Sequence, residues 1–237
     1  MRITNKVAII TGAGRGIGEA IAYRLASEGV NLALVARDES QLKKVKKNCD
    51  EVGIRSEIFP FDLTAIDKIP KLIENILNVF PSFDYLVNNA GTYVNGNPYT
   101  SSLKDWDYCL DLNFRSIYHL TNQLLPAISK NGGAIINISS VAGLMTYQGG
   151  EIYTATKHAL RAYSNCLFDS VREKNIKVTC LFPGYVNTDM GRGDNLISEK
   201  MIQPDDIAFS VSWAISLPTS ACPTEITIRP QHSPYNK

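Results

Sequence analysis

The sequence between residues 7 and 18 reads VAIITGAGRGIG, an apolar run that leads through glycines into a helical pattern. The helical pattern spans Gly16–Glu28, and Gly12, Gly16 and Gly18 lie just before it or in its first residues. Glycines allow the backbone to turn tightly and approach a pyrophosphate, and a helix N-terminus offers free N–H groups with a partial positive charge. Many glycine-rich turns only connect a strand to a helix, but this position between a strand and an amphipathic helix favours a dinucleotide site.

Short apolar runs alternate with longer helical patterns along the rest of the chain. The predicted strands are Val7–Ile10, Asn31–Val35, Arg55–Pro60, Tyr85–Asn88, Ala134–Ile138, Lys177–Phe182 and Glu225–Ile228. The predicted helices are Gly16–Glu28, Glu39–Val52, Asp67–Phe80, Leu103–Ser129, Ile152–Lys174 and Pro204–Leu217. The strands lack polar alternation, which is typical of strands buried on both faces of a parallel sheet. The pattern predicts an α/β protein: a single-domain Rossmann fold with a doubly wound, mostly parallel seven-stranded sheet and helices on both faces.

One domain accounts for nearly the whole chain. We expect residues 1–230 to form a single Rossmann-type domain and residues 231–237 to form a short polar tail, because no repeat, low-complexity tract or linker interrupts the pattern. Pro126 leaves two alternatives open for the helical pattern at 103–129, since a proline there either kinks the helix or ends it.

The composition bears on several classes of partner. The 237 residues contain 24 Lys and Arg against 23 Asp and Glu, so the formal net charge of +1 gives no reason to expect a nucleic acid or a membrane. The N-terminus lacks a signal-peptide layout, and no apolar run approaches the ~18 residues of a membrane span. The five cysteines and three histidines form no metal-ligand pattern, so we expect free thiols, no metal site and a cytoplasmic protein.

The end of the second predicted strand indicates which dinucleotide binds. About 20 residues past the glycine turn, an acidic residue would hold the ribose 2′-hydroxyl of NAD, whereas an Arg would hold the 2′-phosphate of NADP. Ala36 and Arg37 occupy this place, and Arg15 adds a second cation within the turn. Two guanidiniums on one phosphate favour NADP(H). Two alternatives stay open: both arginines are solvated surface residues, or Asp38 faces the ribose and favours NAD.

Tyr153 and Lys157 are separated by four positions in a predicted helix, which puts both side chains on one face. An ammonium near a phenol favours the phenolate, so Lys157 is expected to lower the pKa of Tyr153 from ~10 toward neutral pH, as a general acid or base requires. Ser140 follows the strand Ala134–Ile138, at the carboxyl edge where open α/β sheets bind ligands. A hydroxyl there is placed to donate to a substrate carbonyl oxygen beside Tyr153.

Several short motifs occur together in one order and spacing. They are Thr-Gly-x-x-x-Gly-x-Gly at 11–18, Asp62-Leu63, Asn88-Asn89-Ala90-Gly91, Asn113, Ser140, Tyr153-x-x-x-Lys157 and Pro183-Gly184. In these motifs, and over essentially its whole length, the sequence resembles the short-chain dehydrogenase/reductase family. Each motif is short, but six or more in this arrangement are highly specific.

The resemblance implies a catalytic tetrad of Asn113, Ser140, Tyr153 and Lys157. In that scheme Tyr153 protonates the alkoxide as hydride arrives, and Ser140 orients and polarises the carbonyl. Lys157 holds the nicotinamide ribose and depresses the pKa of Tyr153, and Asn113 supports a water that relays protons. Asn113 lies in an otherwise apolar helical face, so a buried amide satisfied by backbone is an alternative and compatible role.

Taken with the glycine turn and the two arginines, the resemblance implies a set of cofactor contacts. They are Gly12, Arg15, Gly16, Ile17, Gly18, Arg37, Asp62, Leu63, Asn89, Ala90, Gly91, Tyr153, Lys157, Pro183, Gly184, Val186 and Thr188. Asp62 and Leu63 are expected at the adenine, although a capping role for Asp62 is an equal alternative. Gly91 and Gly184 follow strands, where the backbone must pass close to a ligand.

The segments that follow Gly91, Ser140 and Gly184 are expected to form the substrate pocket. The candidate lining residues are Tyr93, Met145, Tyr147, Tyr185 and Met190. They are aromatic or apolar, which indicates an uncharged, hydrophobic carbonyl compound as substrate. Residues 191–195 are predicted to act as a lid over this pocket.

These features predict an NADPH-dependent enzyme that reduces a ketone or aldehyde to an alcohol by reversible hydride transfer, with a small-molecule substrate. A 3-oxoacyl-carrier-protein reductase is an alternative. It is weakened because residues 225–231 lack the glycine pair that usually follows the last strand in those enzymes. A non-catalytic NADP sensor on the same fold is a distant alternative, since such proteins usually lack the tetrad.

Two predicted helices, 103–129 and 152–174, carry apolar side chains on more than one face. These side chains are Trp106, Tyr108, Tyr118, Leu160, Tyr163 and Phe168. A helix that is apolar beyond one stripe needs a second packing partner. The family resemblance implies that such helices pair across two-fold axes, so we expect a homodimer or homotetramer.

Overall fold

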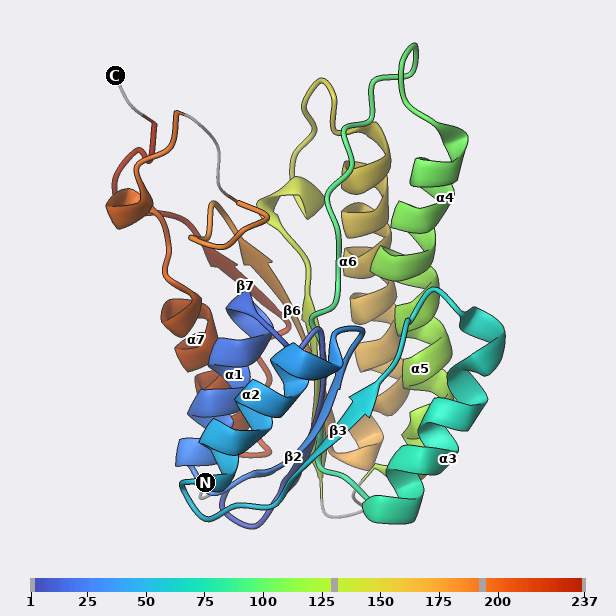
Figure 1. The fold of residues 1–237 in the computed structure, drawn as a ribbon, viewed down its shortest axis with the longest axis vertical. Helices are drawn as coiled ribbons and strands as arrows, with labels where there is room; N and C mark the ends of the chain where they lie inside the picture. Colours follow the sequence, from blue (N-terminus) through green and yellow to red (C-terminus); the bar gives the residue numbers. More distant parts are fainter. Residues whose placement is uncertain (1–2, 129–131, 192–194, 236–237) are drawn as a thin grey trace.

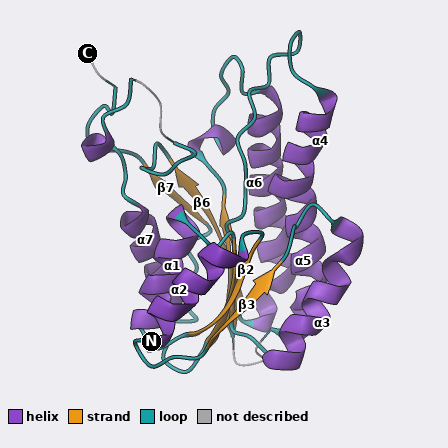
Figure 2. Cartoon of the chain, viewed as in Figure 1, coloured by secondary structure: helices purple, strands orange, loops and turns teal. Residues whose placement is uncertain are grey.

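The computed structural model describes residues 3–128, 132–191 and 195–235, and these form an α/β fold around one sheet (Figures 1 and 2). Its strands are β1 (Val7–Thr11), β2 (Asn31–Ala36), β3 (Ser56–Pro60), β4 (Tyr85–Asn88), β5 (Gly133–Ile138), β6 (Ile176–Pro183) and β7 (Glu225–Ile228). The strand order is β3-β2-β1-β4-β5-β6-β7, and every neighbouring pair is parallel. The predicted fold class is confirmed, with small shifts at the strand ends.

Helices cover both faces of the sheet (Figure 1). One layer contains α1 (Gly16–Ser27), α2 (Glu39–Asp50) and α7 (Pro204–Ser216). The other contains α3 (Ile69–Val79), α4 (Leu103–Leu110), α5 (Ser116–Leu124) and α6 (Glu151–Val171). The two layers give a doubly wound arrangement, in which the strand order reverses between β1 and β4.

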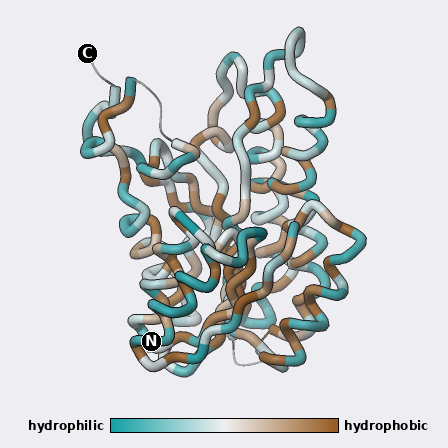
Figure 3. Tube along the Cα trace, viewed as in Figure 1, coloured by the Kyte–Doolittle hydropathy of each residue, from teal (hydrophilic) through white to brown (hydrophobic). Residues whose placement is uncertain are grey.

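Buried strand residues alternate between two hydrophobic cores. In β1, Ala8 and Ile10 pack under α1 and α7, while Ile9 faces the opposite layer with α3 and α5. All three are completely buried. Because both faces of the strand are covered, the sequence shows an unbroken apolar run here, and the most hydrophobic stretches pass through the centre of the molecule (Figure 3).

The predicted helix Leu103–Ser129 is wrong as a continuous element. A π-helical turn, Asp111–Arg115, separates α4 from α5, and a short 3-10 turn at Leu125–Ala127 ends the pattern. Pro126 lies in that last turn, where its missing N–H and its ring oppose further α-helix, so this proline ends the helix. Residue 129 lies outside the described residues.

A chain of buried polar side chains crosses the middle of the sheet. The Asn88 amide donates to Asn137 Oδ1 at 2.8 Å and to Thr121 Oγ1 at 3.0 Å, and the Asn137 amide donates to Ser164 Oγ at 2.8 Å. These four residues come from β4, α5, β5 and α6. Hydrogen bonding offsets the cost of their burial, and the chain joins β4 and β5 to α5 and to α6, the helix that carries Tyr153 and Lys157.

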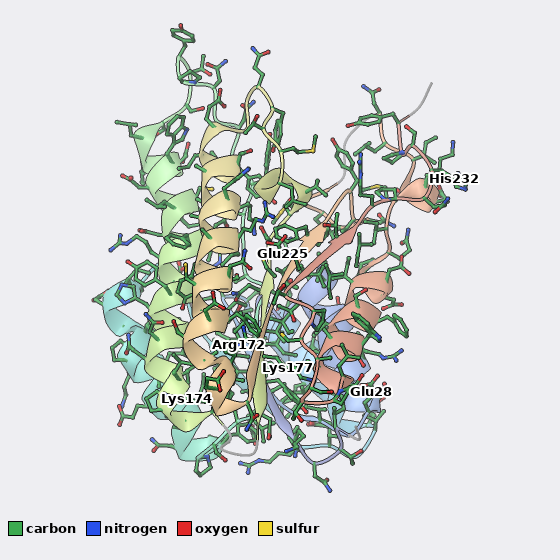
Figure 4. All side chains as sticks on the ribbon, turned by 180° about the vertical axis from the view of Figure 1, so that it is seen from behind. Glu28, Arg172, Lys174, Lys177, Glu225 and His232 are labelled. Atoms are coloured by element: carbon green, nitrogen blue, oxygen red, sulfur yellow. The ribbon has the colours of Figure 1, made fainter. Side chains whose placement is uncertain are left out.

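An ion pair and a charge-assisted hydrogen bond hold the last strand and the last helix in place, and Figure 4 labels one residue of each, Glu225 and Lys177. The Arg161 guanidinium of α6 donates to both carboxylate oxygens of Glu225 on β7, at 2.7 and 2.9 Å. Lys177 of β6 donates to the Leu217 carbonyl at the C-terminus of α7, where a cation is favoured. Among the described residues, every helix is too short or too polar to cross a bilayer.

Candidate functional site

A cleft of about 1550 Å³ runs along the carboxyl edge of the sheet. Residues that follow each strand line it, among them Gly12, Arg37, Asp62, Asn89, Ser140, Gly184 and Arg229. This volume exceeds the roughly 300–1,000 Å³ of a pocket for one drug-sized ligand, so the cleft has room for a dinucleotide and a second ligand. Its position at the strand reversal is where open α/β sheets bind ligands.

The glycine turn is built by close contacts that exclude a side chain. Gly12 has a φ of +64°, and a Cβ there would lie 2.8 Å from Asn89 Nδ2. A Cβ on Gly18 would lie 2.2 Å from the Gly12 carbonyl oxygen. The Asn89 amide donates to the carbonyls of Thr11 and Gly12, at 3.0 and 3.2 Å, which fixes the turn against the end of β4.

Gly18, which was predicted to contact the cofactor, does not line the cleft. Gly12, Gly16 and Ile17 line the cleft, but Gly18 is not among the described residues that do so. Its role is to let α1 pack closely on the turn. No side chain of the described residues caps the N-terminus of α1 at Arg15, so the first helical residues present an anion-binding end to the cleft.

The two predicted phosphate-binding arginines both line the cleft, and each already has a partner. Arg15 Nη1 lies 3.1 Å from the Asp189 carboxylate, and both side chains are exposed. An exposed pair of this kind contributes little stability. Arg37 Nη1 donates to Tyr108 Oη of α4 at 2.8 Å. Tyr108 was predicted only as an apolar helix residue, so its contact with Arg37 is a new feature of the site.

Asp38 is the N-cap of α2. Its carboxylate accepts hydrogen bonds from the backbone N–H groups of Ser40, at 2.9 Å, and Gln41, at 3.1 Å. The hydrogen bond from the Ser40 hydroxyl lowers the pKa of the Asp38 carboxyl. The capping bonds explain why an acidic residue follows Arg37, and they engage the carboxylate that would otherwise face a ribose.

Asp62 and Leu63 line the cleft at the end of β3. The Asp62 carboxylate accepts from the backbone N–H of Thr64 at 3.0 Å and from its hydroxyl at 2.9 Å. Asp62 thus stabilises its own turn, but it is not a helix cap, because the next helical turn has Ala65 at its N-cap position. The predicted contact with an adenine stays a prediction.

Lys157 is buried beneath the cleft and only 4% exposed. Its Nζ donates to the Ile138 carbonyl at the end of β5 at 3.0 Å and lies 5.7 Å from the centre of the Tyr153 ring. Ser139 Oγ donates to the Lys157 carbonyl at 3.1 Å, which fixes α6 against β5. Burial lowers the pKa of Lys157 to about 8, because a charged ammonium loses its hydration there.

The prediction for the pKa of Tyr153 is wrong in direction. Burial raises the pKa of the Tyr153 phenol, and the hydrogen bond with Ser140 only partly opposes this effect. The spacing of Tyr153 and Lys157 correctly puts both side chains on one helix face. Desolvation is the largest effect on the phenol and raises its pKa, so Tyr153 is a neutral phenol at physiological pH.

Ser140 lies at the surface of the cleft, whereas Asn113 is buried below it. Ser140 lines the cleft, hydrogen bonds with Tyr153, and accepts from the Ala142 N–H at 3.1 Å. Asn113 is completely buried within the π-helical turn. Its side chain accepts from the Thr92 N–H at 2.8 Å and donates to the Thr92 carbonyl at 2.9 Å. Asn113 is absent from the described cleft lining, and it holds the segment after β4 in place, as the buried-amide alternative proposed.

The predicted substrate residues follow β4, β5 and β6, whereas Arg37 follows β2. Tyr93, Met145, Tyr147, Tyr185 and Met190 all line the cleft, with exposed fractions between 43% and 53%. The Tyr93 ring meets the Tyr153 ring edge-on, with centroids 5.3 Å apart. The aromatic wall therefore begins in contact with Tyr153. Residues 192–194 of the predicted lid lie outside the described residues.

The sequence model of the short chain dehydrogenases matches residues 6–196. The chain belongs to the short-chain dehydrogenase family. An uncharacterized oxidoreductase of Staphylococcus epidermidis is 31% identical over 230 residues, which cover 97% of this chain and 99% of the relative. An uncharacterized oxidoreductase of Staphylococcus aureus is also 31% identical, over 229 residues that cover 96% of this chain and 98% of the relative.

Solved structures of other family members are closely similar. An alcohol dehydrogenase from Thermococcus sibiricus, complexed with 5-hydroxy-NADP, has a TM-score of 0.89 at 27% identity and covers 98% of this chain and 99% of its own. A metagenomic short-chain oxidoreductase in complex with NADP has a TM-score of 0.85 at 32% identity, with coverage of 98% and 100%. A short-chain dehydrogenase from Mycobacterium paratuberculosis bound to NAD has a TM-score of 0.87 at 25% identity, covering 97% and 98%.

In this short-chain dehydrogenase, sequence reasoning missed one part of the cleft. The segment from Arg229 to Tyr235, described in the sequence only as the end of the domain and a polar tail, lines the substrate end. It has neither periodicity nor a motif, so no local signal identifies it. Within the described part of the chain, no group of three His, Cys, Asp or Glu side chains is arranged to hold a metal ion.

Proposed function

We propose that this short-chain dehydrogenase is an NADP(H)-dependent oxidoreductase that reduces a ketone or aldehyde to an alcohol, reversibly. The observation that carries the proposal is the meeting of Ser140, Tyr153 and Lys157 at the floor of a cleft long enough for a dinucleotide and a substrate. A serine and tyrosine hydroxyl side by side, with a lysine behind the tyrosine, suit proton transfer to a carbonyl oxygen.

The residues of the cleft fit a dinucleotide with a 2′-phosphate. The uncapped N-terminus of α1 suits a pyrophosphate, and close packing of Gly12 against Asn89 and Ala90 holds the turn that precedes it. Arg15 and Arg37 line the cleft, while Asp38 is engaged as a helix cap. Two related structures were solved with NADP or 5-hydroxy-NADP, and another with NAD. The two arginines are the reason to favour NADP(H) here.

The neutral state of Tyr153 suits the proton donor that carbonyl reduction needs. When bound, the nicotinamide supplies or accepts the hydride. Because burial keeps Tyr153 protonated, its phenol can donate a proton to the substrate oxygen, and Ser140 can donate a hydrogen bond to the same oxygen. Lys157 lies beneath the Tyr153 ring and donates to the Ile138 carbonyl, which holds its ammonium at the floor.

The substrate end favours an uncharged carbonyl compound over an acyl group on a carrier protein. Its first contacts are tyrosines and methionines, which bind flat or apolar groups. The 3-oxoacyl-carrier-protein alternative is weakened by the missing glycine pair after β7. A cofactor sensor needs none of the proton-transfer groups, so the filled tetrad counts against that function.

A substrate panel tests the proposal. Purified protein with NADPH is offered ketones, aldehydes and oxoacyl thioesters, and the loss of NADPH absorbance is followed. We expect turnover of apolar ketones or aldehydes, and the variant Tyr99→Phe serves as a matched control because Tyr99 is 95% exposed. NADPH binding without turnover of any compound would indicate the sensor, and turnover of thioesters alone would indicate the carrier-protein reductase.

Self-association and a cytoplasmic location are further parts of the proposal. Phe114 and Tyr118 of the segment around α5 pack edge-on, at 5.5 Å, and Phe114 also meets Tyr163 of α6, at 6.2 Å. These partly exposed rings favour pairing with a second copy as homodimer or homotetramer, and light scattering that shows a monomer at micromolar concentration would refute it. All five cysteines are free thiols, as suits a reducing compartment.

A further inference from the structure

The segment after β7 crosses the substrate end of the cleft. Residues 229–235 all line it, beside the segment that follows β6. Figure 1 shows the two segments together above the carboxyl ends of β6 and β7, and Figure 4 labels His232 on the same outer segment. Two parts of the chain that are far apart in sequence therefore share one wall.

Backbone pairing fixes the segment after β6 at two points. At its base, Val186 pairs with Ile202, and the Asn187 N–H donates to the Ile202 carbonyl at 2.8 Å. Farther out, Leu196 pairs with Tyr235 in an antiparallel bridge, and the Ile197 N–H donates to the Pro234 carbonyl at 2.8 Å. At this second point, both partners of the segment after β6, Pro234 and Tyr235, lie in the C-terminal segment.

A tyrosine pair closes the contact between the two segments. The hydroxyls of Tyr185 and Tyr235 hydrogen bond at 2.5 Å, and their rings meet edge-on with centroids 5.5 Å apart. Both rings stay partly exposed to the cleft, at 43% and 49%. The hydrogen bond with Tyr235 is also the main cause that raises the pKa of Tyr185, to about 12, so the Tyr185 phenol is neutral at physiological pH.

We infer that Tyr235 is a specificity-determining residue, which with Tyr185 forms the outer wall of a site for an uncharged ketone or aldehyde bearing a flat aromatic group. Tyr93 forms the inner wall, edge-on to Tyr153. A carbonyl oxygen that reaches Tyr153 leaves its substituents between these rings, and aromatic rings favour edge-to-face and offset contacts with one another. The inference rests on the proposed function for the nature of the substrate.

The kinetic test compares an alkyl aryl ketone with an aliphatic ketone of equal carbon number. Tyr235→Ala should raise the KM of the aryl ketone roughly three- to ten-fold, because an aromatic contact is lost. Its kcat and the Kd of NADPH should stay within about two-fold. Tyr235→Phe keeps the ring and should recover most of the affinity, and Tyr99→Ala, at an exposed tyrosine outside the cleft lining, should change nothing.

A carboxylated aryl ketone tests the charged groups in the same segment. Arg229 and His232 also line the cleft and are exposed. If Arg229 or His232 chose the substrate, the carboxylated compound would be preferred and Tyr235→Ala would leave its KM unchanged. That result would overturn the inference, as would an unchanged KM for the neutral aryl ketone in Tyr235→Ala.

Hydrogen exchange tests the anchoring without any turnover. The amides of residues 195–202 should exchange about three- to ten-fold faster in Tyr235→Ala than in the wild type, because the contact that supports Ile197 is weakened. If the wild type reduced no carbonyl compound, the proposed function would fail while this measurement still decided whether Tyr235 anchors the wall. Unchanged exchange in Tyr235→Ala would show that it does not.

Discussion

The floor and the rim of the cleft are built in different ways. The floor consists of Ser140, Tyr153 and Lys157, which line the cleft, and of Asn113, which is completely buried and supports it without lining it. The rim consists of Arg15, Arg37, Tyr93, Tyr147, Tyr185 and Tyr235. Floor side chains are held by the backbone: Lys157 by the Ile138 carbonyl and Asn113 by Thr92. Rim side chains are mostly exposed in part and are held by one another, as in the pair Tyr185 and Tyr235.

This difference separates rate from choice of ligand. Backbone partners keep the floor in one geometry whatever the ligand, so changes there should act on the chemical step and on stability. Side-chain partners at the rim can be exchanged without disturbing the fold, so changes there should act on which cofactor or substrate binds. Four substitutions test this division, from the largest expected effect to the smallest.

Tyr153→Phe should give the largest effect. The ring keeps its packing against Tyr93, but the transferable proton is gone. We expect kcat to fall by roughly 10²–10⁴-fold, the usual contribution of a general acid, with little change in the Kd of NADPH. Stopped-flow or steady-state rates with one good substrate provide the measurement. A kcat near that of the wild type would remove Tyr153 from the mechanism.

The rim is expected to set the cofactor preference. Arg37 and Arg15 attract a 2′-phosphate, and charge-assisted contacts of roughly 1.5–3 kcal/mol, discounted for exposure, favour NADPH by about one to three orders of magnitude. Ala36→Asp/Arg37→Ala should therefore shift the ratio of kcat/KM toward NADH and leave kcat with NADH almost unchanged. Wild-type preference for NADH, or no shift in the double variant, would contradict this assignment. Arg172→Ala, at the far end of α6, is a matched control (Figure 4).

The buried ammonium of Lys157 at the floor is expected to lower the free energy of unfolding. Its pKa is about 8 in the folded protein against 10.5 ordinarily, so between these pH values the unfolded chain binds more protons. The free energy of unfolding therefore rises with pH across this window. Lys157→Met removes the buried charge and should stabilise the protein at pH 7, on the order of 1–3 kcal/mol, with the gain fading toward pH 10.

Urea denaturation of the wild type and of Lys157→Met at several pH values measures the difference between their free energies of unfolding. Tyrosines titrate in both proteins, so their contribution cancels in that difference. Lys104→Met, at an exposed lysine of α4, is the control and should show no such trend. A gain in Lys157→Met that is independent of pH, or no gain at pH 7, would contradict the proposed burial of a charged ammonium. The same variant should lose activity, because the floor loses its cation.

Features of the fold and the floor were predictable from the sequence where local patterns determine them, and not where distant contacts or burial do. The strands were predictable because Ile9 and its neighbours are buried on both faces, which leaves an apolar run. The π-helical turn around Asn113 was not, because nothing local interrupts the helical pattern and the deciding contacts reach Thr92. The pKa of Tyr153 was misjudged because helix spacing reports the approach of Lys157 but not the burial of the phenol.

The rim was predictable only where a motif preceded it. Tyr93, Tyr147 and Tyr185 follow recognisable segments and do line the cleft. Tyr235 reaches the same wall through a bridge to Leu196, a pairing between distant segments without a local pattern. Contacts of this kind are set by tertiary packing, and only the structure shows them.

Tyr108→Phe should give the smallest effect, and it tests whether a residue outside the cleft lining positions Arg37 at the rim. Tyr108 lies on α4 and accepts a hydrogen bond at 2.8 Å from Nη1 of Arg37, the residue that follows β2. If this bond holds the guanidinium in place for the 2′-phosphate, its loss should raise the KM of NADPH by about two- to five-fold, at the low end of a hydrogen bond's worth because the site is exposed. The KM of NADH and kcat should not change, and Tyr118→Phe on α5 serves as the control.

In an Arg37→Ala background, Tyr108→Phe should have no further effect, since the two residues act through one contact. A fall in the KM of NADPH would show instead that Tyr108 draws Arg37 away from the phosphate, and an equal effect in both backgrounds would show that Tyr108 acts on the cofactor without Arg37.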